Sequence, residues 1–261
     1  MAKLSKVRIV AHRGCHLENA MQENTLESFR KAIKIGVWGV EFDVRWTKDN
    51  VPVVFHDPDL RRVYGSRIKL AGTSFQKLRR EFPQIPKVEE VLELSRKKVR
   101  LFIEVKGDDA WDHTKIAIFQ ELFEGVVPGV DYYLISRNIP LLRDIRFVPD
   151  SATFLVGEWN LKRLSSYALR KGLAGVIGHF TFLTNNMIKA HHDKDQRVGV
   201  AFPASLNSLC REVNRGVDLI LTNHAETLQG KIEAVQKEIY NQSCLSTSGS
   251  TLRQRFHKDM G

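Results

Sequence analysis

The chain has 261 residues, of which 43% are hydrophobic and 27% charged, so it is long and apolar enough to bury a sizeable core. The net charge of +10 fits either a solvated basic surface or a field that attracts anionic substrates or lipid head groups. Three cysteines without a CxxC pair argue against a disulfide framework or a zinc knuckle. No stretch is long enough to span a membrane and the N-terminal region lacks the apolar run of a signal peptide, so we expect a cytoplasmic protein.

A short strand and a helix are the first elements expected along the chain. Residues 7–11 are apolar and lead directly into the sequence HRG. Asn24 is then expected to open a helix, with Glu27 as its capping-box partner. Gly36 is the expected end of this helix, because glycine readily adopts the left-handed conformation that follows many helices.

Two carboxylates interrupt the next apolar stretch, 37–44, which otherwise predicts a buried strand. Glu41 and Asp43 are two residues apart, so both side chains leave the same face of the strand. Ionised carboxylates on one buried face repel each other, and they persist if a cation neutralises them or if one stays protonated. The turn that follows is short, so 51–56 should run back antiparallel and bring His56 to these acids. Two acids beside an imidazole indicate a hard metal ion with a proton-transfer group next to it.

The rest of the chain alternates between strands and helices. Residues 57–86 are expected to be polar and irregular, and 87–97 to be helical. Further strands, each followed by a helical region, are expected at 99–105, 131–135, 152–156, 174–178, 197–201 and 217–221.

This pattern predicts an α/β fold. With the returning hairpin arm set aside, eight strand–helix units remain, which indicates a (β/α)8 TIM barrel with a β-hairpin after the second strand and a short insertion before the third. A doubly wound open sheet is the alternative, because strand order cannot be read from the pattern. We expect a single domain over 1–240 and a disordered polar tail over 241–261.

Reactive groups of such a barrel gather at the carboxyl ends of its strands. His12 and Arg13 close the first strand, and an arginine followed by a flexible glycine suits phosphate binding. Glu104 and Lys106 end the third strand on one face. They fit a simple ion pair, although a third carboxylate would complete an oxygen site for a metal. Arg45 shares the face of the acids and fits either a partner for them or a second phosphate contact.

Other polar and aromatic residues are given less specific roles. His191 and His192 are adjacent on an expected helix, so they point apart and are expected to be exposed. His179 is left as structural or solvent-facing. Trp159 and Phe180 follow strand ends and could line a substrate cleft, although aromatic residues there more often serve packing.

The segments AHRG, ENTLESFRKAIKIG, VEFDVRWTKDNVPVVFHDPDLRR, FIEVKG and GVDLILTN occur in this order. Together they closely resemble the glycerophosphodiester phosphodiesterase family, from about residue 8 to residue 228. The resemblance implies a barrel that hydrolyses glycerophosphodiesters to sn-glycerol 3-phosphate and an alcohol, with one divalent cation, Mg²⁺ or Ca²⁺. By position it also implies roles for individual residues: metal ligands Glu41, Asp43 and Glu104, catalytic His12 and His56, and phosphate contacts Arg13 and Lys106.

The chain departs from the family pattern in places that remove no catalytic group. Gln22 replaces a frequent proline, the usual aromatic WT pair is Ala201-Phe202, and Asn223 replaces a common aspartate. The missing tryptophan leaves open how the glycerol or alcohol end is held. The alternative is a lysophospholipase D or sphingomyelinase D-like enzyme on the same fold, with a hydrophobic groove for an acyl chain. Basic residues are scattered, so we expect no nucleic-acid partner, while membrane contact and oligomeric state are left open.

Overall fold

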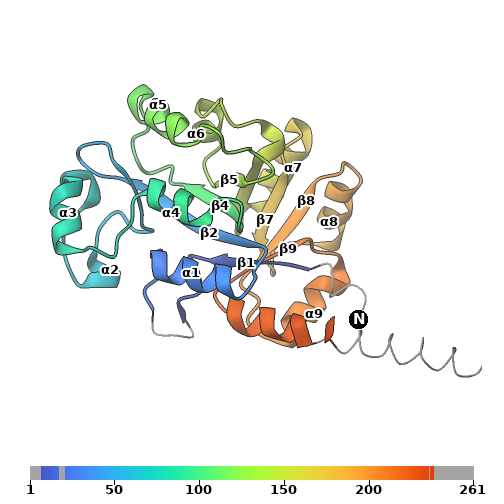
Figure 1. Cartoon of the computed structure of the whole chain (residues 1–261). Helices are drawn as coiled ribbons and strands as arrows, with labels where there is room; N and C mark the ends of the chain where they lie inside the picture. Colours follow the sequence, from blue (N-terminus) through green and yellow to red (C-terminus); the bar gives the residue numbers. More distant parts are fainter. Residues whose placement is uncertain (1–6, 18–20, 235, 238–261) are drawn as a thin grey trace, which may run out of the picture.

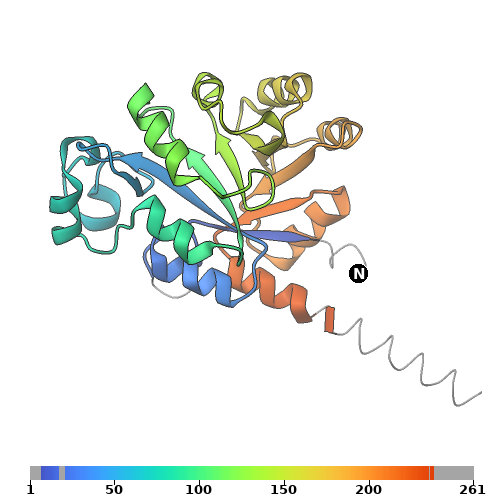
Figure 2. The same ribbon diagram turned by 45° about the horizontal axis from the view of Figure 1, so that its top comes forward.

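Eight parallel strands close into a barrel in this computed structural model, which describes residues 7–17, 21–234 and 236–237 (Figures 1 and 2). The strands follow one another around the barrel as β1 (Arg8–His12), β2 (Gly39–Trp46), β4 (Arg100–Val105), β5 (Tyr132–Ser136), β6 (Thr153–Gly157), β7 (Gly175–His179), β8 (Arg197–Ala201) and β9 (Leu219–Thr222). Pairing of β1 with both β2 and β9 closes the ring. The barrel prediction is therefore confirmed, and the open doubly wound sheet is excluded.

Helices cover the outside of the barrel, as Figures 1 and 2 show. Those between barrel strands are α1 (Leu26–Lys34), α4 (Val88–Ser95), α5 (His113–Leu122), α6 (Ile139–Asp144), α7 (Leu161–Lys171), α8 (Asn185–His192) and α9 (Leu206–Arg215), with a 3₁₀ turn, η4 (Asp150–Ala152), before β6. Residues 225–234 are also helical. No helix among the described residues has the length and apolar character to cross a bilayer. The expected tail, 241–261, lies outside the described residues.

The start of α1 differs from the prediction. Thr25, not Asn24, is the N-cap, and Ser28, not Glu27, completes the capping box. The Thr25 hydroxyl accepts the Ser28 N–H, which satisfies one of the free amide groups at the helix start. Asn24 lies one residue earlier with a φ of 58°, a left-handed conformation that asparagine tolerates better than most residues. The cap therefore leaves the Asn24 side chain available for another contact.

Alternation along β2 separates the core from the site. Val40, Phe42 and Val44 point outward into the large hydrophobic cluster beneath the helices. Glu41 and Asp43 lie on the opposite face, inside the barrel, and both are fully buried. The two-residue alternation along β2 therefore directs apolar side chains into the core and two carboxylates into the barrel interior.

Aromatic rings fill the barrel below these carboxylates. Phe102 stacks on Tyr133 with ring centroids 5.2 Å apart, and Tyr133 meets Phe154 edge-on at 5.3 Å. Phe102 precedes Glu104 by two residues on β4, so the aromatic layer lies one step beneath the polar layer. The interior is consequently a packed core, and chemistry is confined to the carboxyl ends of the strands.

The hairpin arm β3 (Pro52–Val54) pairs antiparallel with β2 as expected, but the segment after it is not irregular. It forms α2 (Arg61–Tyr64), η3 (Leu70–Gly72) and α3 (Phe75–Glu81), seen beside the barrel in Figure 1. A separate hydrophobic cluster holds it together, with members Val53, Phe55, Leu60, Leu70, Leu78 and Ile85. These apolar residues are widely spaced among charged ones, so no helical period is visible in the sequence.

Candidate active site

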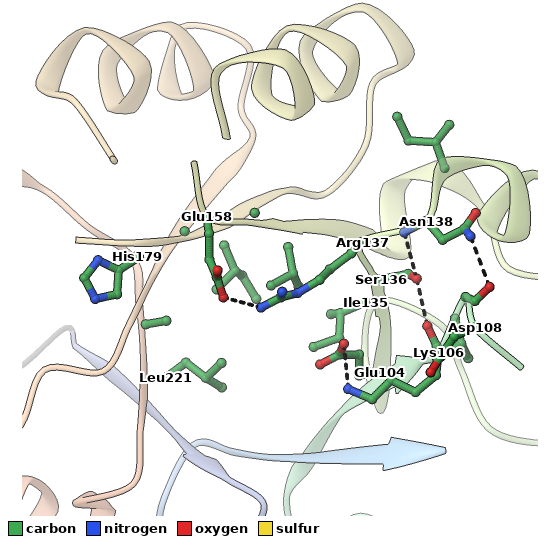
Figure 3. A pocket seen from close by; sticks show the side chains of 18 of the residues that line it. Glu104, Lys106, Asp108, Ile135, Ser136, Arg137, Asn138, Glu158, His179 and Leu221 are labelled. Carbon is green, nitrogen blue, oxygen red and sulfur yellow. Dashed lines mark hydrogen bonds and ion pairs between the residues drawn. The ribbon is translucent and has the colours of Figure 1, made fainter. Parts of the chain in front are cut away.

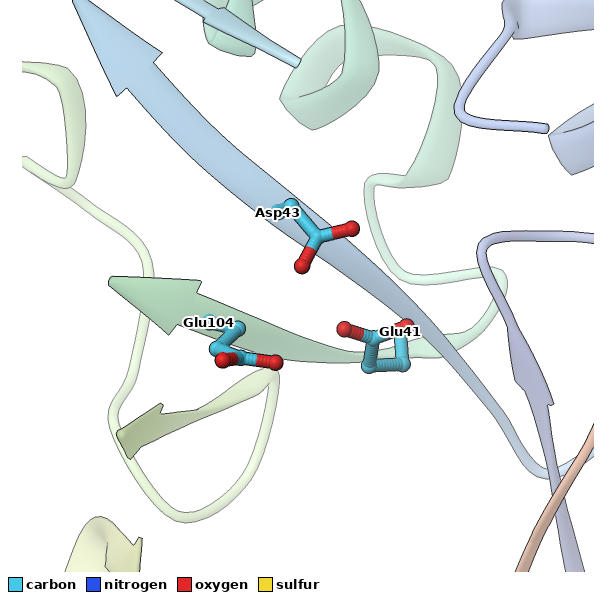
Figure 4. Close-up of side chains that lie close together, drawn as sticks. All are labelled: Glu41, Asp43 and Glu104. Carbon is cyan, nitrogen blue, oxygen red and sulfur yellow. The ribbon is translucent and has the colours of Figure 1, made fainter. Parts of the chain in front are cut away.

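The three predicted metal-ligating carboxylates converge at the carboxyl ends of β2 and β4. Asp43 is the direct neighbour of Glu104 in the pairing of these strands, and Glu41 lies one step below on the same face of β2. One oxygen from each residue lies within 4.8 Å of the others (Figure 4). Parallel strands bring their carboxyl ends to one edge, which is why residues more than 60 positions apart meet here.

Two cationic side chains lie against this cluster. The ammonium of Lys106 is 2.5 Å from Asp43 Oδ1 and 2.8 Å from Glu104 Oε1. The guanidinium of Arg13 places Nε 3.3 Å from Asp43 Oδ2. Burial on its own would raise the pKa of Asp43, but the charges of Lys106 and Arg13 outweigh it and lower that pKa. Asp43 is therefore held as a carboxylate.

Glu41 has fewer partners for its carboxylate oxygens than Asp43 has. Its Oε2 accepts the backbone N–H of Arg13 at 3.0 Å, while its buried Oε1 has no hydrogen-bond partner. Burial, followed by the charges of Asp43 and Glu104, raises the pKa of Glu41 well above its usual range. A divalent cation would relieve both the unpaired oxygen and the repulsion, and carboxylate oxygens are the ligands that Mg²⁺ and Ca²⁺ prefer. The residues present therefore fit such an ion.

His12 lies at the edge of the carboxylate cluster. Its Nδ1 is 2.6 Å from the side-chain oxygen of Asn223, and its Nε2 is 3.8 Å from Glu41 Oε2. The ring of Phe202 meets the imidazole edge-on at a centroid distance of 5.2 Å. Burial, followed by the charge of Arg13, lowers the pKa of His12 to about 4, so the imidazole is neutral near pH 7.

His56 follows β3 and reaches the site from the hairpin. Its Nδ1 is 2.6 Å from Asp57 Oδ1, and the other oxygen of Asp57 accepts from Nε of Arg62, also at 2.6 Å. About a third of the His56 side chain is exposed. Both histidines line one cavity of about 1170 Å³ at the barrel mouth, together with Arg13, Glu104 and Lys106. The structure thus brings the predicted site residues to one place.

Three residues of the site were missed by sequence reasoning. Asn24 donates from Nδ2 to Asp43 Oδ2 at 2.9 Å and so orients a predicted metal ligand. Glu23 binds Arg13 Nη1 at 2.9 Å, and Asn223 holds His12. The sequence did contain one signal, because asparagine is enriched in the left-handed conformation that Asn24 adopts. No signal indicated that Asn223, at the far end of the chain, would pair with His12.

Other expectations had mixed outcomes. Arg45 is a partner for acids, but for Asp108 at 2.8 Å and Asp109 at 3.0 Å, not for the carboxylate cluster. The prediction that His191 is exposed was wrong. It is fully buried, because α8 turns this residue toward α7.

Residues at the strand ends also departed from expectation in part. His179 lines the cavity, and its ring lies 4.2 Å from that of Phe180, with Phe182 and Phe202 farther away at 6.1 and 6.4 Å between centroids. Trp159 is outside that cavity and is 81% exposed, while Phe180 packs against the outer core. Phe202 lines the cavity at the position where the sequence pattern described above usually has its WT pair.

Known proteins resemble the chain at the level of sequence. The model of the glycerophosphoryl diester phosphodiesterase family matches residues 12–148, which is more than half of the chain. Glycerophosphodiester phosphodiesterase 1 of Mus musculus is 36% identical over 116 residues, covering 39% of this chain and 34% of that protein. The chain therefore matches about a third of the length of this mammalian relative. Glycerophosphodiester phosphodiesterase of Caldanaerobacter subterraneus is 25% identical over 254 residues, covering 85% of this chain and 96% of that relative.

Solved structures agree on the fold. A phosphodiesterase of Oleispira antarctica, solved with the product sn-glycerol-3-phosphate, superimposes with a TM-score of 0.76 at 22% identity. The match covers 87% of this chain and 96% of that one. A protein of Galdieria sulphuraria gives a TM-score of 0.75, also at 22% identity, over 87% of this chain and 97% of that one.

A closed (β/α)8 barrel with an acidic cluster and two histidines at its mouth defines a class of barrel proteins with a polar site at the carboxyl ends of the strands. The chain belongs to the glycerophosphoryl diester phosphodiesterase family.

Proposed function

We propose that this protein hydrolyses glycerophosphodiesters to sn-glycerol 3-phosphate and an alcohol, using one divalent cation and two histidines. The observation that carries the proposal is the convergence of Glu41, Asp43 and Glu104 within 4.8 Å, where Glu104 also lines a cavity together with both imidazoles. Family membership supports the reaction class, and the relative from Oleispira antarctica was solved with sn-glycerol-3-phosphate, the product named here.

The three carboxylates would hold Mg²⁺ or Ca²⁺, which when bound would neutralise charge on a non-bridging phosphate oxygen. Asn24 keeps Asp43 oriented for this task through its amide hydrogen bond. Lys106 now lies between Asp43 and Glu104. With those oxygens engaged as ligands, its ammonium would be free to donate to a phosphate oxygen, and Arg13 would bind a second one through its guanidinium fork.

The two histidines are held by different partners, His56 by Asp57 and His12 by Asn223, each through Nδ1 at 2.6 Å. One imidazole would accept a proton from the nucleophile, and the other would donate a proton to the departing alcohol. The bond from phosphorus to the alcohol oxygen breaks as a bond forms from phosphorus to the oxygen of the nucleophile. That nucleophile is either water, or the glycerol 2-hydroxyl followed by opening of the cyclic phosphate by water.

A substrate panel tests the proposal. Glycerophosphoinositol, glycerophosphoethanolamine and glycerophosphocholine are incubated with the protein, and sn-glycerol 3-phosphate is measured. We expect the product to appear with Mg²⁺ or Ca²⁺ and to disappear with EDTA. Lysophosphatidylcholine serves as the competing substrate, with released choline as its readout because its hydrolysis yields lysophosphatidic acid and choline. Faster release of choline from it than from glycerophosphocholine would instead support a lysophospholipase D. Absence of product from every diester in the presence of both metals would overturn the proposal.

A further inference from the structure

The cationic side chains that line the cavity at the barrel mouth differ in whether a carboxylate pairs with them. Arg13, Arg45 and Lys106 line it near the acidic cluster, and each is paired with carboxylates. Arg137 is paired too, since its Nη2 lies 2.6 Å from Glu158 Oε1 (Figure 3). The cationic side chains close to the reaction centre are therefore already engaged with acids of the chain itself.

Two further arginines line the same cavity at its other side. Arg163 and Arg170 are both on α7, and within the described part of the chain no carboxylate lies within 4.0 Å of either guanidinium. They are seven residues apart, so they share one face of the helix, separated by two turns or about 10 Å along its axis. Tyr167, four residues after Arg163, also lines the cavity and lies between them. This face of α7 presents two uncompensated positive charges and a phenol.

The helix that carries these arginines is held firmly against the barrel. Leu161 and Leu164 are fully buried on the inner face of α7. They fit against Gly157 of β6 and Gly178 of β7, where an added Cβ would collide with these leucine side chains. Because the strand glycines let the helix approach so closely, the opposite face of α7 has a fixed position relative to the strand ends. The two guanidiniums thus extend from a rigid support.

The cavity connects this helix face to the reaction centre. Its lining includes His12 and Glu104, Arg137 and Glu158, and residues of α6 and α7. A phosphodiester bound at the acidic cluster has two arms, and one of them is a glycerol without charge. Unpaired guanidiniums at the far side would not strengthen the binding of an uncharged alcohol arm, and they would repel a quaternary ammonium. They would bind an arm that carries a phosphate group.

We propose that Arg163, Arg170 and Tyr167 form an anion subsite for the leaving alcohol, so that the preferred glycerophosphodiesters carry a further phosphate group on that alcohol. This inference rests on the proposed hydrolysis and specifies its substrate class. Arg163 and Arg170 are specificity-determining residues in this scheme, because they contact the departing group and not the reacting phosphorus.

Two diesters that differ by a single phosphate group test the subsite. The kcat/KM values of glycerophosphoinositol 4-phosphate and glycerophosphoinositol are compared at fixed ionic strength, with sn-glycerol 3-phosphate as the readout. We expect a ratio of about 10 in favour of the phosphorylated substrate, as for one charge-assisted hydrogen bond at a partly exposed site. Arg163→Gln and Arg170→Gln should each lower the ratio toward one, mainly through the KM of the phosphorylated substrate.

Lys171→Gln is the matched control, because it removes the same charge from the same helix at an exposed position outside the cavity. It should keep the wild-type ratio. Both substrates are measured on one preparation, so the loss of folded protein in a variant cancels in the ratio. Measurement in high salt should also lower the ratio, since the contact is electrostatic.

The outcomes separate the two proposals. If neither substrate yields sn-glycerol 3-phosphate, the proposed hydrolysis fails. If both are hydrolysed equally by the wild type, the hydrolysis holds and the anion subsite is wrong. The same phosphate chemistry also occurs on a lipid surface, so vesicles with phosphatidylinositol 4-phosphate form a separate arm. Vesicle binding that Arg163→Gln abolishes, combined with a substrate ratio of one, would assign the arginines to a membrane and overturn the substrate assignment.

Discussion

His12 Nδ1 lies 2.6 Å from the side-chain oxygen of Asn223, across the seam where the first strand of the barrel meets the last. An amide oxygen can only accept, so this contact places the hydrogen of the imidazole on Nδ1 and leaves Nε2 directed toward the acidic cluster. A residue more than 200 positions away in the sequence therefore selects the tautomer of a proposed catalytic group.

Asn223→Leu should lower kcat by about 10-fold or more, because an imidazole without its acceptor loses its fixed tautomer and orientation. Asn223→Asp keeps an acceptor and is the matched control, which should retain more activity than the leucine variant. The measurement is kcat with glycerophosphoinositol at saturating metal. Equal activity in the wild type and the leucine variant would show that the contact has no catalytic role.

His12→Ala and His56→Ala should each reduce kcat by about 10²–10⁴-fold, the usual range for loss of one general acid or base. Folding and metal binding should stay close to wild type in both variants, since neither imidazole is a proposed ligand. Thermal unfolding and metal titration of the same samples check these controls. Full turnover in either variant would remove that histidine from the mechanism.

Mg²⁺ or Ca²⁺ should raise the thermal unfolding temperature of the wild type. An ion present at 100 times its Kd stabilises a folded protein by about 2.7 kcal/mol. Glu41→Gln should lose most of this shift, because it removes one ligand charge while its amide oxygen still accepts the Arg13 N–H. Without metal the variant should be at least as stable as the wild type, since Glu41 has an unpaired buried oxygen. An unchanged metal shift in the variant would contradict the assignment of Glu41 as a ligand.

His191 should make stability depend on pH. Burial lowers the pKa of this imidazole, which contacts Ser165 and Gln196. In the unfolded chain this imidazole takes up a proton near pH 6.5, whereas in the folded chain it does so only at lower pH. Its contribution to the free energy of unfolding is therefore fully present above about pH 6.5 and decreases as the pH falls below that value.

The slope from this residue should approach 1.4 kcal/mol per pH unit at about one proton of difference. Urea unfolding at pH 7 and pH 5 measures it. His191→Gln should be less stable at pH 7 and should show a smaller loss between the two pH values. His12 and His16 add to the dependence of the wild type, because burial lowers the pKa of each, so the comparison between the two proteins isolates His191.

Periodicity predicted the barrel because strand and helix signals are local. The alternation of Val40 and Phe42 with Glu41 and Asp43 predicted which face of β2 packs in the core and which face carries the site. The acidic cluster was predictable for the same reason, since strand ends share one edge in a parallel barrel. Glu104 needed the further assumption that an oxygen site requires a third carboxylate.

Contacts that depend on distant segments were not predictable. His191 is buried with hydrogen bonds to nearby Gln196 and to Ser165 of α7, which lies 26 residues earlier, and the sequence around His191 does not indicate the contact with α7. Arg45 finds Asp108 and Asp109 in the loop after β4, more than 60 residues away. The N-cap of α1 was misassigned because Asn24 and Thr25 are both good N-cap residues. The side chain of Asn24 instead donates a hydrogen bond to Asp43, and this contact was not visible in the sequence.

The hairpin insertion gives the two imidazoles separate supports. His12 belongs to the barrel, whereas His56 and Asp57 are attached to a unit with its own hydrophobic cluster around Leu60 and Leu78. Detachment of that small unit would dismantle the proton-transfer pair while the eight-stranded ring remained intact. Heating should therefore abolish activity before the barrel unfolds. Amide hydrogen exchange in the hairpin insertion should detect this inactive state.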